Sequence, residues 1–332
     1  MPAREPGAVE PSAERAAALD RRMRERLEES LRYLVSEVSG PLDLDPALLE
    51  GFCERLRSGP VPPLAFGAYF ELVLALENGD WEAARELLQE IAAAPNHAGG
   101  PVVLDLADPA SDRGASRYHR LIDTDPNEPF QVLPPPPELA RACRERISEA
   151  FELLGRGDPE LAREIRGLLR EIVLAVGPIR PGSMTFDGAS SFMLWGAIVL
   201  NPRMFQSALE VAQALAHESG HNLLFGLCVD GSLVENDDEP RYTSPLRRDL
   251  RPMDGIVHAT FVTARMHRSL LQLRASGALS GVEDAEAGRL LADHVRNFAM
   301  GWKIVDRDAR LTERGKHVMA DARRHMQAHA GA

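Results

Sequence analysis

The spacing of apolar and polar positions predicts a chain built mainly from helices. Apolar residues recur at helical intervals over most of the sequence, with charged residues between them. Two of these helices have clear start signals, because Asp80 precedes one and Ser207 forms a capping box with Glu210 at the start of another. The expected helices are 15–38, 46–56, 66–76, 81–93, 138–155, 159–176, 207–226, 253–273, one around 290–302 and a last one capped by Thr312.

Three short apolar runs interrupt this pattern and are typical of strands. They cover residues 102–106, 130–133 and 191–200, and the dipeptide Asn201-Pro202 stops the last of them. The whole pattern therefore predicts an α+β fold that is predominantly helical and contains a small sheet. Prolines at 134–137 form a stiff linker. This linker places a domain boundary between a mainly helical N-terminal region, 1–133, and a second domain, 138–332.

The expected helix 207–226 carries an H-E-x-x-H pentad, His217-Glu218-Ser219-Gly220-His221. Composition alone gives roughly 0.03 such pentads by chance in a chain of this length. Residues four apart share one face of a helix, so both imidazoles can reach one metal ion, with Glu218 beside them. A strand that leads into such a helix is the arrangement of a zincin-like site, in which the metal helix lies beside a small sheet. We therefore predict that 138–332 is a metal-binding catalytic domain.

The residues after the pentad restrict the kind of metal site. Metzincins continue the motif with Gly and His, and Leu224 and Leu227 stand at those positions, which excludes that class. Gluzincins take a glutamate from a later helix, but Glu235 and Glu239 lie in an acidic run that is expected to be a solvated loop. The better third ligand is His258, a polar residue within the apolar stretch of the helix 253–273. A buried core histidine is the alternative interpretation.

Neighbours of His258 on the same expected helix refine this hypothesis. Asp254 lies one turn before His258 and is placed to orient its ring. His267 is half a turn out of phase and is expected to face away. Three neutral imidazoles leave coordination positions open on a divalent ion. With zinc this is a hydrolase site and with ferrous iron an oxygenase-like site, so the histidines alone do not choose the metal.

An arginine-rich segment, 242–252, leads into the helix of His258. A guanidinium can bind a carboxylate through two hydrogen bonds. A dicarboxylate such as 2-oxoglutarate needs such an anchor when its other end chelates iron. The candidates are Arg247, Arg248 and Arg251, with Arg265 two turns after His258 on the same helix face. A solvated basic loop without a ligand is the alternative.

Taken together, these segments resemble a known family. The runs 196–201, 217–221 and 251–258, with Ser244-Pro245-Leu246-Arg247 between them, are similar to HExxH-motif proteins encoded beside ribosomal-peptide (RiPP) pathways. Those proteins are 2-oxoglutarate-dependent peptide β-hydroxylases, and the resemblance covers about residues 180–275. It implies a dioxygenase that holds Fe(II) through His217, His221 and His258. It also implies that 2-oxoglutarate is anchored by the segment that contains Ser244, Arg247 and Arg251, or by Arg265.

The resemblance further implies that the substrate is a side chain of a precursor peptide, hydroxylated at its β-carbon. Glu218 then supports the site or handles a proton instead of acting as a peptidase base. Two other functions stay open: a zinc-dependent HExxH metallopeptidase with Glu218 as general base, and a catalytically silent metal-binding partner in a modification complex. Binding of a peptide or leader by the region 1–133 is a further hypothesis, and no sequence motif in that region supports it.

Charge and composition narrow the setting of this chemistry. The net charge is −12 and the pI about 5.4, which argues against nucleic acid as a partner and leaves a neutral or basic substrate open. The sequence has three widely spaced cysteines, no apolar run long enough to span a bilayer and no signal-peptide core at its N-terminus. We therefore expect a cytoplasmic protein without a membrane partner, and the sequence leaves the oligomeric state open.

Overall fold

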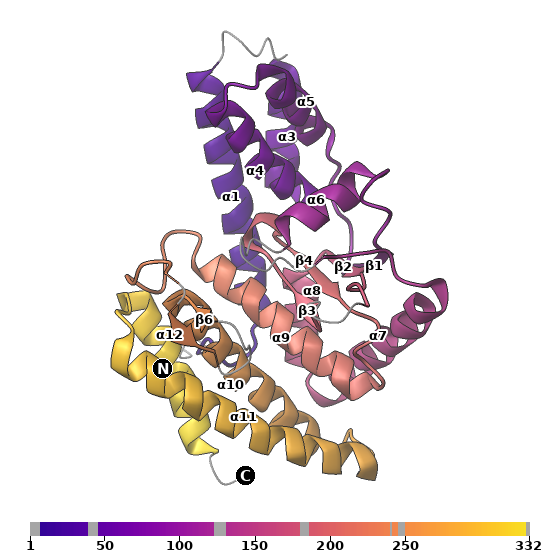
Figure 1. Ribbon diagram of the computed structural model, residues 1–332, viewed down its shortest axis with the longest axis vertical. Coiled ribbons are helices and arrows are strands. Elements are labelled where there is room, and N and C mark those ends of the chain that lie inside the picture. The colour runs from indigo at the N-terminus through magenta and orange to yellow at the C-terminus, as the bar shows by residue number, and fades with distance from the viewer. Residues whose placement is uncertain are drawn as a thin grey trace. The chain divides into compact units, whose positions relative to one another are not determined.

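The computed structural model of the chain describes residues 7–38, 46–122, 131–179, 186–239, 241–244 and 250–329 (Figure 1). It is mainly helical with a small sheet, which confirms the predicted class at that level. The helices are α1 (Ala13–Glu37), α3 (Pro46–Ser58), α4 (Pro63–Glu77), α5 (Trp81–Ala93), α6 (Arg113–Leu121), α7 (Pro137–Gly157), α8 (Pro159–Leu168), α9 (Ala208–Leu227), α10 (Met253–Ala275), α11 (Gly281–Asp308) and α12 (Glu313–Ala328). The strands are β1 (Val102–Asp105), β2 (Glu171–Leu174), β3 (Gly188–Ala189), β4 (Ala197–Leu200), β5 (Tyr242–Thr243) and β6 (Leu250–Arg251), and η1 (Phe192–Leu194) is a short 3₁₀ helix. Within these described ranges, no helix combines the length and the apolar character that crossing a membrane requires.

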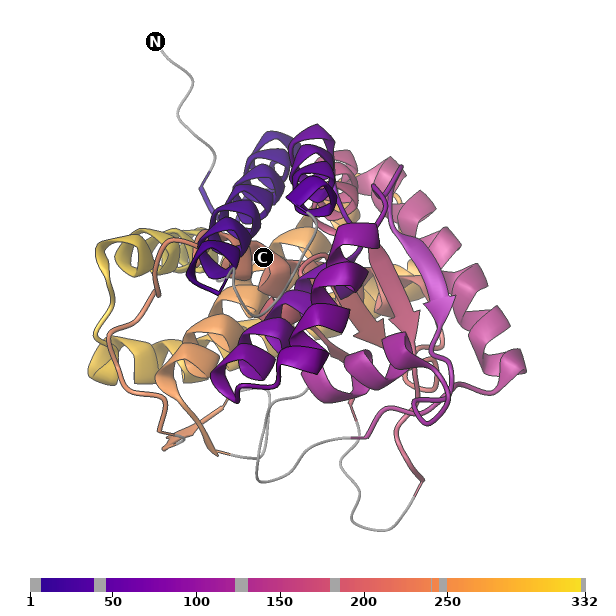
Figure 2. The same ribbon diagram turned by 90° about the horizontal axis from the view of Figure 1, so that it is seen from above.

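The larger sheet has the strand order β1-β2-β4-β3, and its strands lie side by side in Figure 2. β1 pairs in parallel with β2 and β2 in parallel with β4, whereas β3 runs antiparallel to β4. β2 and β4 are buried along their whole length, while β1 is mostly exposed and forms an edge. Continuous apolar sequences such as Ile172-Val173-Leu174 suit strands that are covered on both faces.

Two elements predicted from the sequence differ from those in the structure in this region. The sequence predicts one helix over 159–176, but α8 ends at Leu168 and β2 begins at Glu171. A strand buried on both faces lacks polar alternation, so its apolar run has the same appearance as a buried helix. The expected strand 191–200 is reduced to β4, because Gly196 takes a positive φ of 84° and η1 occupies the residues before it.

Helix α6 lies where the sequence predicts only a polar loop. Asp112 caps it by accepting a hydrogen bond from the N–H of Ala115 at 2.7 Å. Its apolar face buries Tyr118 and Leu121 in one cluster with Val173 and Val199 of the sheet. Of the expected strand 130–133, Leu133 forms an isolated bridge with Val176, and Phe130 lies outside the described residues.

The chain forms two compact units, each made of segments that are far apart in the sequence. The first consists of 1–16, 145–165 and 206–332, and the second of 17–144 and 166–205. This division differs from the contiguous one expected at the 134–137 linker. The reason is strand pairing, because β1 from the N-terminal half pairs with β2 from beyond the linker. The sheet belongs to the second unit and α9 to the first, so the zincin-like pairing of metal helix and sheet stays a prediction.

Candidate metal site

Helix α9 carries the pentad in its interior. The helix begins as predicted, because the Ser207 hydroxyl accepts the N–H of Glu210 at 3.2 Å and the Glu210 carboxylate accepts the N–H of Ser207 at 3.2 Å. His217 and His221 lie one turn apart on this helix, and their rings are 4.9 Å apart between centroids. The pentad is therefore held on a regular, well-capped helix.

Gly220 allows helix α10 to approach α9 closely beside the pentad. A Cβ added to Gly220 would lie 3.1 Å from Cγ1 of Val262, closer than an ordinary van der Waals contact. Val262 lies one turn after His258 on α10. The same close packing therefore brings the third histidine to the first two. α10 also packs against α11 and α12, which fixes it within the first unit (Figure 1).

The structure brings the three predicted metal ligands together. His221 Nε2 lies 3.2 Å from His217 Nε2, and His221 Nδ1 lies 3.1 Å from His258 Nδ1. Two imidazole nitrogens bound to one tetrahedral ion at the usual bond length lie about 3.3 Å apart, which matches the spacing of His217 and His221. The contact of His258 has a similar length but is made to the other ring nitrogen of His221. A hydrogen bond between two buried imidazoles gives the same contact, so the alternative of an ordinary core histidine stays open.

The donor set fits a divalent transition ion, but the rings do not yet meet at one point. Among the described residues, no group of three or more His, Cys, Asp or Glu side chains is arranged to hold a metal ion. The cause is visible at His221, which faces His217 with Nε2 and His258 with Nδ1. One imidazole gives one nitrogen to one ion, so a shared ion requires the His258 ring to turn toward the edge of His221 that faces His217.

Burial keeps these imidazoles in the form that binds metal. Burial lowers the pKa of His217 to about 4. Burial also holds the pKa of His221 well below its usual range, and the charges of His217, His258 and Arg251 add to this shift. Both rings are therefore neutral at pH 7, and a metal ion need not displace a proton from either nitrogen lone pair.

Met266 fixes which nitrogen of His217 is available. Its Sδ lies 3.3 Å from Nδ1 of His217, and a thioether can only accept a hydrogen bond. The Nδ1 atom therefore carries the proton, and Nε2 presents its lone pair toward His221. Sequence reasoning missed this residue, although Met266 lies two turns after His258 on the same face of α10.

Glu218 is buried beside the histidines, with 4% of its surface exposed. Its Oε1 lies 3.9 Å from Nε2 of His217, and the Asn222 amide donates a hydrogen bond to the Glu218 carbonyl at 3.2 Å. The carboxylate thus lies close to the metal-binding edge of His217. This position suits a general base and equally suits a group that orients a ligand, so both predicted roles remain.

Two further side chains border His258. The Asp254 Oδ2 atom lies 3.7 Å from Nε2 of His258, the side on which the sequence predicts an orienting carboxylate. Phe225 was not predicted to take part, yet its ring lies 5.5 Å from His258 and 6.4 Å from His221. Its position one turn after His221 is the signal that identifies it.

Among the arginines of the 242–252 segment, Arg251 is the one that the structure describes, and its charge acts on the histidines. It belongs to β6, which pairs with β5 and packs against α10, and its charge contributes to the lowered pKa of His221. A Cβ added to Gly255 would lie 3.4 Å from Nε of Arg251, so the side chain lies over the first turn of α10. Ser244 follows β5 and is buried, and Arg247 and Arg248 lie outside the described residues.

Arg265 does not point to the histidine cluster as its position two turns after His258 predicts. Its guanidinium forms an ion pair with Glu164, which is fully buried, and donates to the backbone carbonyls of Ala8 and Val9 at 3.2 Å each. Glu164 also pairs with Arg15 at 2.9 Å. Arg265 therefore holds the N-terminal segment against α8 and α10, and we remove it from the candidates for co-substrate binding.

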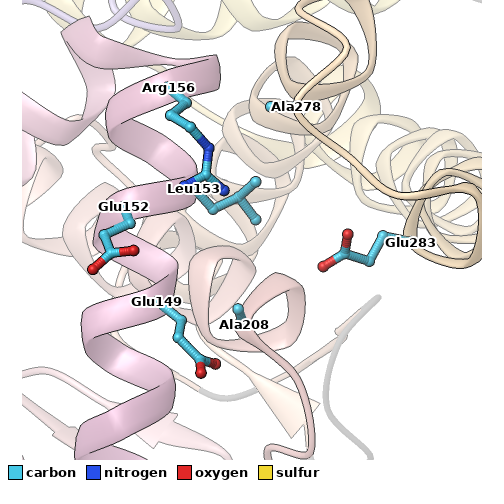
Figure 3. A pocket seen from close by; sticks show the side chains of 7 residues that line it. All are labelled: Glu149, Glu152, Leu153, Arg156, Ala208, Ala278 and Glu283. Atoms are coloured by element: carbon cyan, nitrogen blue, oxygen red, sulfur yellow. The ribbon is translucent and has the colours of Figure 1, made fainter.

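A cavity of about 230 Å³ lies apart from these histidines (Figure 3). Its lining residues are Glu149, Glu152, Leu153, Arg156, Ala208, Ala278 and Glu283. Carboxylates from α7 and α11 line it together with one arginine, and none of the predicted site residues does. The cavity is therefore a separate feature of the first unit and not the metal site.

Comparisons with known proteins do not assign a family or a function to this site. No family model matches the chain, and no curated protein matches it. The resemblance to HExxH peptide β-hydroxylases consequently stays a prediction that rests on the quoted motifs. The functional conclusion has to come from the three imidazoles, the buried glutamate and the arginine at the start of α10.

Proposed function

We propose that the chain is a cytoplasmic Fe(II)- and 2-oxoglutarate-dependent hydroxylase that acts on a β-carbon of a precursor-peptide side chain. One observation carries this proposal. His217 and His221 meet His258 from a second helix, and Arg251 places a positive charge close enough to act on His221. A neutral ligand set beside a guanidinium favours a co-substrate that brings negative charge to both.

Different side chains would bind the iron and the 2-oxoglutarate. His217, His221 and His258 would hold the iron, and 2-oxoglutarate would contribute two carboxylates, one at the iron and one for Arg251. Bound iron supplies the activation of oxygen, and the reaction balances as peptide C–H, oxygen and 2-oxoglutarate giving peptide C–OH, succinate and carbon dioxide. Met266 would orient the imidazole of His217 and Asp254 that of His258, and the Phe225 ring packs beside His258.

A zinc-dependent peptidase is the second candidate, and one observation favours it. The buried Glu218 carboxylate lies 3.9 Å from the metal-binding nitrogen of His217, where a general base would act on a bound water. The two functions make different products from the same peptide. Incubation with Fe(II), 2-oxoglutarate and air should give succinate and a peptide with one added oxygen atom, whereas a peptidase with zinc gives two shorter peptides.

Replacing Glu218 with glutamine separates these functions. In a hydroxylase, E218Q should retain iron binding and part of the succinate formation, because no step requires a carboxylate base beside His217. In a peptidase the same change should lower hydrolysis by about 10²–10⁴-fold, the usual contribution of a general base. Glu235→Gln, in the exposed acidic loop, is the matched control and should change neither activity. Zinc-dependent cleavage that E218Q abolishes, with no succinate from the parent chain, would overturn the proposed function.

A further inference from the structure

A second cluster of imidazoles lies on the opposite face of α10 from His258. His267 is nine residues after His258, half a turn out of phase, and it is almost fully buried. It meets His325 near the end of α12, and His329 follows one turn later. The expectation that His267 faces away from the pentad is therefore met, but the residue has histidine partners of its own.

Two of the three rings in this cluster lie at a spacing that a shared ion would also give, and the third lies beside them. His267 Nδ1 lies 3.1 Å from His325 Nε2, close to the spacing of about 3.3 Å for two nitrogens on one tetrahedral ion. The ring of His329 lies 4.7 Å from that of His325 and 6.5 Å from that of His267. His325 and His329 are four residues apart at the end of one helix, the same spacing that the pentad uses.

The tautomer of His329 is already set for metal binding. Its Nδ1 lies 2.8 Å from the carbonyl oxygen of His325 and must carry the proton to form that hydrogen bond. Its Nε2 therefore presents a lone pair, as in metal sites where the other ring nitrogen is bonded to a carbonyl. The three rings are not closed around one point among the described residues. His329 is exposed at the end of α12, so its side chain has room to turn inward.

His294 of α11 gives an independent sign of a site in this region. It is 5% exposed, and its Nδ1 atom has no hydrogen-bond partner among the described residues. Burial and, to a smaller extent, the neighbouring His267 and His217 together lower its pKa to about 4, so the ring lies near both clusters. A bound ion or water molecule is one explanation for a buried nitrogen without a partner in a native fold.

The surroundings of His325 contain charges of both signs. Burial lowers its pKa to about 4, the charges of His329 and Arg268 lower it, and Asp321 raises it. The Arg268 charge is itself paired with Asp158 and Glu10. A divalent ion at these imidazoles would therefore not face an unpaired Arg268.

We propose that His267, His325 and His329 bind a second divalent transition ion, zinc, which joins the C-terminal helix α12 to α10. Imidazole ligands without carboxylates select zinc and its neighbours over magnesium or calcium. Because His329 is exposed and His325 is half-buried, the ion would enter from the surface. The site is independent of the function proposed for the pentad, since it shares no ligand with it.

The test uses the full chain with H217A and H221A, which removes the pentad site, titrated with Zn²⁺ and with Co²⁺ as a spectroscopic probe. One equivalent should bind, and Zn²⁺ should raise the melting temperature. Adding H325A and H329A should weaken binding by more than roughly 100-fold, since losing ligands costs more than disturbing the groups that orient them. His317→Ala is the matched control, because His317 is exposed on α12 and its Nδ1 lies 2.7 Å from the Glu313 carbonyl oxygen, away from the proposed ligands.

Metal content after dialysis gives a second measurement that does not depend on the pentad variants. The parent chain should retain two equivalents and the chain with H325Q and H329Q one equivalent, with unchanged helical circular dichroism. The proposal is overturned if H325Q and H329Q leave the metal content unchanged. An equal loss in H317A would show ordinary surface binding and would overturn it as well.

Discussion

Replacing His258 with alanine is expected to lower the affinity of the pentad site for Fe(II) or Zn²⁺ by more than roughly 100-fold, beyond the cost of removing a group that only orients a ligand. The reason is that His258 supplies the third imidazole to a pair of histidines, and its Nδ1 lies 3.1 Å from His221. Competition with a chromophoric chelator measures the change. The titration is made in a chain that also carries H325A and H329A, so that one site reports.

Asp254→Asn is the matched comparison for His258→Ala. Asp254 lies 3.7 Å from Nε2 of His258 and is 44% exposed, so its loss disturbs the ring without removing a nitrogen donor. We expect a decrease in affinity of about 10-fold, the lower end for such residues. An H258A chain that binds metal as tightly as its parent would show that His258 is a core histidine, as the alternative interpretation holds.

Replacing Arg265 with alanine is expected to destabilise the first unit by about 3–5 kcal/mol. Glu164 is fully buried and is held by Arg265, by Arg15 and by the N–H of Ser12 at 2.7 Å. Without Arg265 a buried carboxylate keeps only part of its compensation, and the carbonyls of Ala8 and Val9 lose a donor. Urea unfolding followed by circular dichroism measures the loss.

Two further variants make this result specific. Arg274→Ala, on the same helix but in the exposed pair with Asp284, should leave stability nearly unchanged. The double variant with Arg265→Met and Glu164→Leu should be more stable than Arg265→Met alone, because the buried carboxylate that has lost a partner is removed, while Arg15 keeps its hydrogen bonds to the carbonyls of Gly7 and Glu10. If R265A instead keeps full stability and loses 2-oxoglutarate binding, Arg265 is a co-substrate anchor after all.

The contrast between Arg265 and the histidines shows what a sequence can predict about a site. The spacing of His217 and His221 is local, so the helix period alone places both rings on one face. His258 could be found because a polar residue within an apolar helix needs a partner. The partner of Arg265 lies 101 residues away in α8, and no periodicity within α10 reveals it.

The same limit applies to the fold. Helix starts such as the capping box at Ser207 depend on neighbouring residues and were predicted correctly. The end of α8 and the start of β2 depend on what covers that segment, and the sequence of the segment alone does not contain this information. The two units are discontinuous because β1 pairs with β2 across the proline-rich linker. A linker of this composition suggests a domain boundary, so the sequence alone does not indicate this pairing.

The most direct test of the central claim is anaerobic reconstitution with Fe(II), followed by addition of 2-oxoglutarate and a visible spectrum. The parent chain should develop the iron–2-oxoglutarate charge-transfer band. R251A should need roughly 30-fold more 2-oxoglutarate or more, the effect of losing one partner of a hydrogen-bonded charge pair. The matched control R241A, which removes an exposed arginine paired with Asp237 before β5, should titrate like the parent. A chain that binds Fe(II) but gives no band at any 2-oxoglutarate concentration would contradict the account.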